Sequence, residues 1–392
     1  MAKHHCGICK NKQLSLLWDL PKLPLTECFG AYDPEFSCYD QELMICDYCG
    51  HVQLDNHLEA EVLYTENEYS YRTANALSTP KRIQSFVDFS YQYINKKEKL
   101  SIVDIGGNDQ ALLNSFGFKM KRTLVDPRRR ADDGMVVDGV NIIGRFIEEI
   151  NLSDEISPIP NVIVCTHTLE HIQTPYKFLE QLAKQCSTDC LFIFEVPCLE
   201  NMVKASRFDG FFHQHLHYFS LHSLTNLIEY IGGSILGHAY NSIATMGGSI
   251  MIAFRFDGKA KNIRKMNNIP ALINHFNIQK SGFQNRMNDI SEEINGNRIY
   301  GFGASLMLPT LLYHLNIEAE AFHVILDDDS QKNGWQYKNL NLTIIDPKKE
   351  NVPRDQVFMV TSLENAVPIA NRIKSFSPRK VLLPMVDNFD LT

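Results

Sequence analysis

The feature that most constrains the fold is a regular alternation of short apolar runs and helical patterns, which begins at Leu100. Five of the runs are expected to be buried strands, at residues 101–105, 122–126, 141–143, 161–166 and 191–196. Strands that alternate with helices in this way form a doubly wound, mostly parallel sheet. We therefore predict an α/β chain whose central domain, residues 63–257, is Rossmann-like.

The strand–helix pattern restarts after a polar, helix-prone connector that ends at Gly296. Further strands are expected at residues 298–301, 321–326, 357–360 and 380–383. The turn Gly301-Phe-Gly303-Ala304 matches the dinucleotide fingerprint only in part. Residues 258–392 are therefore expected to form a smaller C-terminal Rossmann-like domain that helps to shape a cleft.

Two cysteine pairs mark a third region at the start of the chain. Cys6 and Cys9 form the first pair, and Cys46 and Cys49 form the second after 36 intervening residues. Four thiolates in two close pairs fit one tetrahedral Zn²⁺ with no open position, so this zinc should be structural. We predict a small zinc-binding domain over residues 1–62, with Cys28 and Cys38 as the substitutes if one ligand is wrong.

Composition narrows the range of partners. The 392 residues carry a formal net charge of −8, and no basic patch of the kind that binds nucleic acid stands out. The polar start of the chain lacks the apolar core of a signal peptide, and no apolar run is long enough to cross a bilayer. We expect a cytoplasmic protein with reduced thiols and no membrane partner, and the oligomeric state stays open.

The first strand of the central domain leads into a candidate cofactor site. Asp104 lies in this strand, and the turn that follows contains Gly106, Gly107 and Asn108. Asp126 ends the next strand, where a carboxylate can accept both hydroxyls of a ribose. The turn lacks a full pyrophosphate cradle, and Asp104 can face a positively charged amino group, so S-adenosylmethionine is favoured over a dinucleotide.

A lower-ranked residue of the same site is Phe146, which follows the third strand and is predicted to lie near the adenine.

A histidine cluster follows the fifth strand. His213, His215 and His217 alternate just before Tyr218, and His171 follows the fourth strand. In open α/β sheets, ligands bind at the carboxyl ends of the strands. No HExxH-type carboxylate motif accompanies the histidines, so acid–base chemistry is favoured over a metal site. We interpret His217 as structural and leave His213 open.

As an ordered set, these motifs resemble the sugar C-methyltransferases that act on nucleotide-linked 4-keto deoxysugars. The matching segments run nearly from end to end: the two cysteine pairs, Val103–Asp109, Thr168–His171, Phe194–Pro197, Phe208–His215, Tyr218–Ser220, Gly247–Ser249, Gly301–Ala304 and Asp329–Gly334. The resemblance implies a zinc-binding N-terminal domain, a central class I S-adenosylmethionine-dependent methyltransferase domain and a C-terminal Rossmann-like domain.

The resemblance also implies a mechanism and an acceptor from deoxysugar biosynthesis, a nucleotide sugar. A ketone acidifies the carbon beside it, a histidine removes that proton, and the resulting enolate attacks the methyl group of S-adenosylmethionine. His215 takes the base position and His171 lines the site. A tyrosine near the sugar corresponds to Tyr69 or Tyr71, of which we select Tyr71, and Tyr218 completes the catalytic set.

The chain departs from the family pattern mainly on the acceptor side. The family's Tyr and Glu are replaced by Phe212 and Gln214, so no carboxylate at position 214 can raise the pKa of His215. This chain has Met246 where the family commonly has His, and Ile250-Met251 where the family commonly has Leu-Arg. Residues 305–307 lack the family's Lys. Two alternatives therefore stay open: methylation of an oxygen or nitrogen, and a catalytically weakened S-adenosylmethionine-binding protein.

Overall fold

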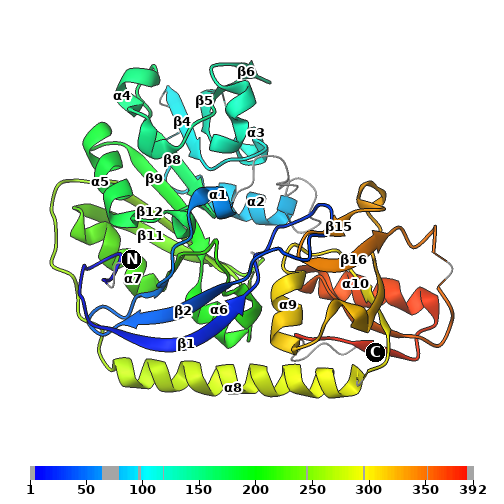
Figure 1. The fold of residues 1–392 in the computed structure, drawn as a ribbon. Coiled ribbons are helices and arrows are strands. Elements are labelled where there is room, and N and C mark those ends of the chain that lie inside the picture. Colours follow the sequence, from blue (N-terminus) through cyan, green and yellow to red (C-terminus); the bar gives the residue numbers. More distant parts are fainter. Residues whose placement is uncertain are drawn as a thin grey trace.

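The protein is represented by a computed structural model that describes residues 5–63, 79–95, 99–117, 119–243, 246–294, 296–350 and 352–385. In the described residues the strands form three sheets, one for each predicted region. Figure 1 shows the central sheet at the upper left, the N-terminal strands below it and the C-terminal part at the right.

The central sheet has eight strands in the order β11-β12-β9-β8-β4-β5-β7-β6. Its five parallel strands confirm the five predicted strands: β4 (Leu100–Ile105), β5 (Met120–Val125), β7 (Val140–Ile143), β8 (Val162–Thr166) and β9 (Leu191–Pro197). Three strands run antiparallel at the two margins: β6 (Val136–Val137), β11 (Gly233–Asn241) and β12 (Ser249–Phe256). The predicted doubly wound sheet is therefore present, with antiparallel edges.

Successive side chains of each central strand point to opposite faces, and both faces are covered. One face packs on α5 (Pro175–Gln185) and α7 (Leu221–Tyr230), which contribute side chains such as Phe178 and Leu227. The opposite face packs on α2 (Thr79–Ser90) and α3 (Ala111–Ser115), which contribute Phe86 and Leu113. Because both faces are buried, the strands are nearly continuous apolar runs, and this is what made them recognisable.

The N-terminal region forms a four-stranded sheet in the order β1-β2-β3-β10. Its strands are β1 (Leu14–Leu23), β2 (Tyr39–Cys46), β3 (Val52–Leu54) and β10 (His217–Tyr218). The last of these comes from the histidine cluster, because His217 pairs with Gln53 and Tyr218 with Val52. The N-terminal sheet is thus completed by the segment that carries the candidate catalytic residues.

The C-terminal sheet has the order β15-β16-β14-β13-β17-β18. Its strands are β13 (Ile299–Phe302), β14 (Phe322–Leu326), β15 (Gln336–Tyr337), β16 (Leu340–Ile345), β17 (Val357–Val360) and β18 (Lys380–Leu382). All except β15 run parallel, which agrees with the predicted second Rossmann-like unit.

The predicted helix-prone connector is the long helix α8 (Ile269–Ile294), which lies along the base of the molecule in Figure 1. Lys280 of α8 donates a hydrogen bond to the carbonyl of Leu17 in β1, at 3.1 Å. The remaining helices are α1 (Ala60–Leu63), α4 (Leu152–Glu155), α6 (Leu199–Lys204), α9 (Leu308–Leu315) and α10 (Ala366–Ile373). The domain boundaries at residues 62/63 and 257/258 stay predictions.

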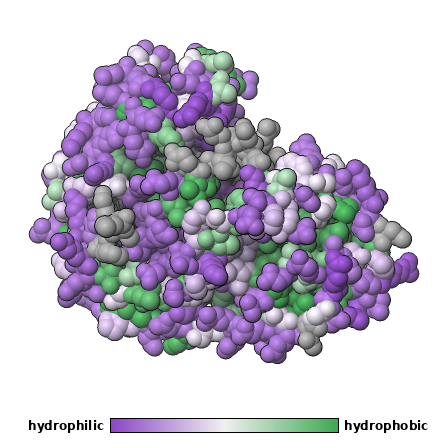
Figure 2. Space-filling view, in the orientation of Figure 1, coloured by the Kyte–Doolittle hydropathy of each residue, from purple (hydrophilic) through white to green (hydrophobic). Residues whose placement is uncertain are grey.

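The surface in Figure 2 is mainly hydrophilic, with hydrophobic residues in scattered groups. Within the described ranges, each helix is too short or too polar to cross a membrane.

Candidate functional site

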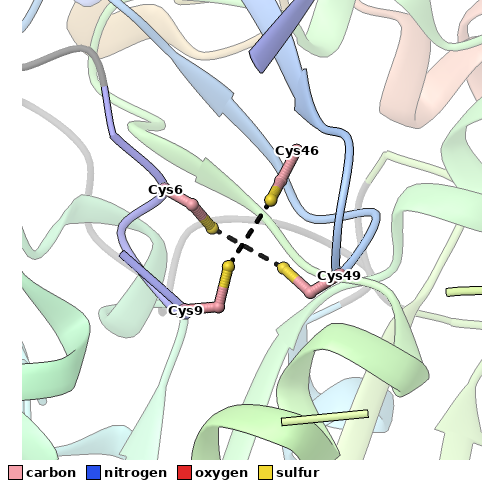
Figure 3. Close-up of side chains that lie close together, drawn as sticks. All are labelled: Cys6, Cys9, Cys46 and Cys49. Carbon is pink, nitrogen blue, oxygen red and sulfur yellow. Dashed lines mark hydrogen bonds between the residues drawn. The ribbon is translucent and has the colours of Figure 1, made fainter. Parts of the chain in front are cut away.

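The four predicted zinc ligands point at one another. Cys6 and Cys9 lie in the turn before β1, Cys46 ends β2, and Cys49 lies in the turn before β3. Their sulfur atoms meet in pairs, with Cys6 to Cys49 at 3.6 Å and Cys9 to Cys46 at 3.5 Å (Figure 3). All four sulfurs lie within 4.8 Å of one another.

This arrangement fits a tetrahedral zinc ion. A Zn–S bond of about 2.3 Å places neighbouring sulfurs about 3.8 Å apart, close to the observed separations. The separations are far too long for disulfides, whose S–S bond is about 2.05 Å. Cys28 and Cys38, the alternative ligands considered from the sequence, lie outside this group. The N-terminal region is therefore a zinc-binding domain with a closed, structural site.

The turn after β4 brings its backbone close to neighbouring segments. A Cβ atom on Gly106 would lie 2.1 Å from the hydroxyl of Thr168, and one on Gly107 would lie 2.4 Å from a carboxylate oxygen of Asp104. Gly106 also has a φ of +75°, in the left-handed region that favours glycine. A side chain at either position would therefore require Thr168 or Asp104 to move, so the two glycines allow this turn to pack closely on its neighbours.

Asp104 is the most unusual group of this turn. Its side chain is 0% exposed, and neither carboxylate oxygen has a hydrogen-bond partner among the described residues. Burial, with the nearby charges of Asp126 and Asp109, raises the pKa of Asp104 to about 8. A buried, unpaired carboxyl group is costly, and a cationic ligand group would relieve that cost.

Asp126 follows β5 and organises the same turn. Its carboxylate accepts hydrogen bonds from the backbone N–H of Asn108 and of Arg128, each at 2.9 Å. The guanidinium of Arg128 adds two bonds, from Nε at 3.2 Å and from Nη2 at 3.1 Å. The acid thus holds the Gly-rich turn through its backbone contacts, while the partly exposed Arg128 covers its outer side.

The remaining predicted cofactor residue, Phe146, follows β7 and is 40% exposed. It lies at the carboxyl end of the parallel strands, as do Asp104 and Asp126. The structure therefore groups the predicted cofactor residues along one edge of the sheet.

His171 and His215 meet beside this edge. His171 belongs to a short 3₁₀ segment, η4 (Leu169–His171), that follows β8, whereas His215 lies in the loop just before β10. Their ring centroids are 4.8 Å apart, and the rings are nearly perpendicular. The Nδ1 of His171 lies 2.8 Å from the carbonyl oxygen of Gln214, so Nδ1 carries the proton and donates it.

Burial dominates the electrostatics of His215. Its side chain is almost fully buried, and burial, together with the neighbouring His171 and His167, lowers its pKa well below the ordinary value. The imidazole is therefore neutral at physiological pH, the form that can accept a proton. The ring of Phe212 packs on it with a centroid distance of 4.3 Å.

The structure places a carboxylate near His215 that does not come from position 214. Glu170 of η4 places Oε1 at 4.0 Å from Nε2 of His215 and at 3.5 Å from Nδ1 of His167. It is fully buried, and burial raises its pKa to about 7. The sequence reasoning missed Glu170 and His167, although both follow the end of β8, the position that had drawn attention to His171.

Glu195 at the end of β9 is a second missed carboxylate. It lies 3.9 Å from Nε2 of His167 and accepts a hydrogen bond from Asn241 at 3.0 Å.

The other members of the histidine cluster make structural contacts. His213 is buried between the carbonyl of Leu23, at 3.0 Å from Nε2, and the amide of Gln41, at 3.2 Å from Nδ1. His217 lies 3.0 Å from His51, beside the zinc-binding turn. Both ring nitrogens of His213 are used by the N-terminal sheet, so it is not available as a base.

Gln214 also faces the N-terminal domain. Its amide oxygen accepts a hydrogen bond from the hydroxyl of Thr26 at 3.0 Å, and its Nε2 donates to the carbonyl of Thr26 at 3.2 Å.

The predicted catalytic tyrosines have different positions. Tyr218 is buried, and its hydroxyl lies within hydrogen-bond distance of the backbone of Gly210 and Phe212. This supports the shape of the loop that carries His215. Tyr69 and Tyr71 lie outside the described residues.

The C-terminal region touches the same loop through an ion-pair group. Arg207 binds Asp209 with two bonds of 2.8 Å and Glu364 with a bond of 2.7 Å. Glu364 also accepts a hydrogen bond from the backbone N–H of Met246 at 2.9 Å, where the family has a histidine. The C-terminal domain thus contacts the candidate acceptor side of the site.

Three family models match consecutive parts of the chain. A zinc binding domain model matches residues 6–64, a methyltransferase domain model matches residues 77–235, and a C-methyltransferase C-terminal domain model matches residues 244–380. The order of the three models agrees with the order of the three sheets.

A curated relative is the C-methyltransferase NovU of Streptomyces niveus, which is 28% identical over 216 residues. The alignment covers 54% of this chain and 50% of NovU, so the chain spans about half the length of the curated relative that it matches.

Among solved structures, the plantazolicin methyltransferase BpumL in complex with SAH matches 47% of this chain and 87% of its own, at 16% identity and a TM-score of 0.36. The N-methyltransferase NodS from Bradyrhizobium japonicum WM9 matches 46% of this chain and 98% of its own, at 13% identity and a TM-score of 0.35. Both the sequence identities and the TM-scores are low.

Proposed function

Since this chain belongs to the S-adenosylmethionine-dependent methyltransferases that combine a zinc-binding domain, a methyltransferase domain and a C-methyltransferase C-terminal domain, we propose that it methylates carbon. The proposed acceptor is the carbon beside the ketone of a nucleotide-linked keto-deoxysugar. The proposed location is the cytoplasm, because reduced cysteines such as the four grouped for zinc persist in a reducing compartment.

One observation carries the proposal: the segment that bears one of two neighbouring neutral histidines packs on the Gly-rich turn. The segment that holds His171 packs on this turn through Thr168, whose hydroxyl donates to the carbonyl of Ile105 at 3.3 Å. His215 lies next to His171. A base at this place is close to the site where the methyl donor would bind, as methyl transfer to a carbanion-like carbon requires.

The residues proposed for the cofactor fit its chemistry. Asp104 would face the ammonium group, Asp126 would accept the ribose hydroxyls, and Phe146 would lie against the adenine. The ribose hydroxyls would take the place of the Arg128 guanidinium, whose two bonds now occupy the Asp126 carboxylate. When bound, S-adenosylmethionine supplies an electrophilic methyl group.

His215 is proposed as the general base. In its neutral form it removes the proton from the carbon beside the ketone, and the enolate that results is the nucleophile. His171 donates its Nδ1 proton to the carbonyl of Gln214, which fixes the ring orientation. The lone pair of His171 is then on Nε2.

Loss of two family side chains beside the base favours one alternative, methylation of an oxygen or nitrogen. Phe212 removes a hydroxyl that could donate to the enolate oxygen, and removing such a donor can cost about 3 kcal/mol. A heteroatom acceptor forms no enolate and would tolerate this loss. Restoring the family residues with Phe212→Tyr and Gln214→Glu should raise the rate on a keto sugar, whereas an unchanged rate would favour the heteroatom acceptor.

The test is methyl transfer from ¹³C-methyl-labelled S-adenosylmethionine to a panel of nucleotide-linked keto sugars, with the product analysed by NMR. A new carbon–carbon bond beside the ketone supports the proposal, and a methyl group on oxygen or nitrogen supports the alternative. Absence of transfer to every member of the panel contradicts methylation of a keto sugar and supports the catalytically weakened S-adenosylmethionine-binding protein.

A pair of variants tests the base. His215→Ala should abolish transfer and leave the affinity for S-adenosylmethionine unchanged. The matched control is His275→Ala, because His275 is an exposed histidine of α8. Wild-type turnover by His215→Ala would rule out this mechanism.

A further inference from the structure

The fold joins two histidines and a carboxylate into one compact group. One ligand atom from each of Glu170, His171 and His215 lies within 4.8 Å of the other two. Glu170 is 0% exposed, and neither of its oxygens has a hydrogen-bond partner among the described residues. Removing a carboxylate from water without a partner is strongly unfavourable, and a bound cation would offset that cost.

The three side chains match the ligand preferences of transition metals. Two imidazoles and one carboxylate are a common ligand set for first-row divalent ions such as Zn²⁺, Fe²⁺ and Co²⁺. The histidines lack an HExxH-type carboxylate in the sequence, but the fold supplies a carboxylate from η4 and brings His215 to it from the loop before β10. The group therefore has the composition of a metal site.

The separations within the group suit an ion better than a direct contact. Oε1 of Glu170 lies 4.0 Å from Nε2 of His215, which is too long for a hydrogen bond. Two bonds of about 2.1 Å to one ion can bridge this distance. Ligand atoms around a tetrahedral ion lie about 3.4 Å apart, so the three atoms would close on the ion by roughly 1 Å or less.

Both histidines are in the form that binds metals. Burial lowers the pKa values of His171 and His215, so both imidazoles are neutral. Nδ1 of His171 donates to the carbonyl of Gln214 at 2.8 Å, which puts the lone pair on Nε2. Metal-binding histidines usually make such a bond from their second nitrogen, because it fixes the orientation of the ring.

We propose that Glu170, His171 and His215 form a second metal site, which binds a divalent transition-metal ion such as Zn²⁺ or Co²⁺ and blocks the base while the ion is bound. The ion takes the lone pair of His215 that would accept the substrate proton. This block rests on the proposed function, in which His215 is the base, whereas binding of the ion does not.

The second site should differ from the cysteine site in its exchange with solution. Four cysteines close the structural zinc site, but three protein ligands leave one coordination position open. His171 is only partly buried, so the group can be reached from solvent. We therefore expect this ion to exchange readily while the structural zinc stays bound.

The first experiment counts ions and does not require turnover. Full-length protein that holds one zinc per chain is dialysed against Co²⁺, and both metals are measured by atomic absorption. Wild type should gain one Co²⁺ per chain and keep its zinc, whereas Glu170→Gln and His215→Asn should gain none. The matched control is Glu195→Gln, because Glu195 is also buried but lies outside the group, and this variant should gain one Co²⁺.

The second experiment uses wild-type protein alone, so it decides the site even if a variant does not fold. The side chains of its 14 histidines are labelled with ¹⁵N, and one equivalent of Zn²⁺ is added to the zinc-loaded protein. The nitrogen signals of two histidines should shift. Unchanged spectra would overturn the site.

The third experiment measures methyl transfer in the presence of Co²⁺. The wild-type rate should fall in proportion to the fraction of sites that hold Co²⁺, and dialysis against metal-free buffer should restore it. The rate of Glu170→Gln should not respond to Co²⁺.

The outcomes separate the two proposals. Wild type that gains no Co²⁺, or Glu170→Gln and His215→Asn variants that gain as much as wild type, would overturn the metal site. An ion that binds to the group without slowing an active enzyme would overturn the block. If wild type methylates no keto sugar, the proposed function fails, and the ion count still decides the metal site.

Discussion

Asp104 gives the sharpest prediction, because its carboxyl group must change its protonation state when the cofactor binds. A pKa of about 8 means that roughly nine in ten of these carboxyls are protonated at pH 7. The ammonium group of S-adenosylmethionine or S-adenosylhomocysteine favours the ionised form. We therefore expect binding at pH 7 to expel a proton from Asp104.

The magnitude follows from the pKa. Ionising a carboxyl group one pH unit below its pKa costs about 1.4 kcal/mol, so the affinity at pH 7 should be about tenfold below that of a pre-ionised site. Affinity should rise nearly tenfold per pH unit below pH 7 and about threefold between pH 7 and pH 8. Above this pH the free ligand loses its own ammonium proton, at a pKa of about 8, so affinity should peak there. At pH 7 the net release should be about 0.8 proton per ligand.

The assay is titration calorimetry with S-adenosylhomocysteine at pH 7 in phosphate and in Tris, two buffers with different ionisation enthalpies. The difference in observed heat counts the protons released. Asp104→Asn should release none, and Asp88→Asn, a change on the exposed side of α2, should behave like wild type. Equal proton release by wild type and Asp104→Asn would show that Asp104 does not face the ammonium group.

Three further changes test other parts of the structure. Cys46→Ser should lower the zinc content, measured by atomic absorption, from one ion per chain towards zero. It should also destabilise the N-terminal domain, since metal binding and local folding are coupled. Full zinc content would remove Cys46 from the ligand set. Asp126→Ala should weaken binding of S-adenosylmethionine by about 1.5–3 kcal/mol in calorimetry through lost charge-assisted hydrogen bonds, and an unchanged Kd would refute the ribose assignment. Gln214→Glu should reduce the free energy of unfolding in urea by about 0.5–1.5 kcal/mol, because the carbonyl of Thr26 loses its amide donor and keeps only the weaker thiol donor of Cys28; unchanged stability would argue against that contact.

The sequence predicted the central sheet well because each buried strand is a continuous apolar run. Residues 191–196 were expected, and β9 spans Leu191–Pro197. The zinc ligands were also recoverable, since their spacing is local. The two-residue strand β10 was not, because its pairing with β3 is a tertiary contact with no apolar run of its own.

Residue roles within the site were harder to predict. The sequence showed only that position 214 offers His215 no carboxylate, because Gln214 stands there. The folded chain brings Glu170 to this ring from a segment more than 40 residues earlier. No sequence pattern indicates which buried acid will face which histidine, because that depends on how η4 and the loop after β9 pack.

The segment that carries His215 is bound to the N-terminal domain by three sets of hydrogen bonds. His213 binds Leu23 and Gln41, Gln214 binds Thr26, and β10 pairs with β3. The zinc-binding domain therefore supports the proposed active site, and we expect that it cannot be exchanged between relatives as an independent unit. A chimera would have to carry the loop at residues 207–220 together with residues 5–63 to keep these contacts. For the same reason, a zinc chelator should inhibit the enzyme from a distance. It should lower kcat before it lowers the affinity for S-adenosylmethionine.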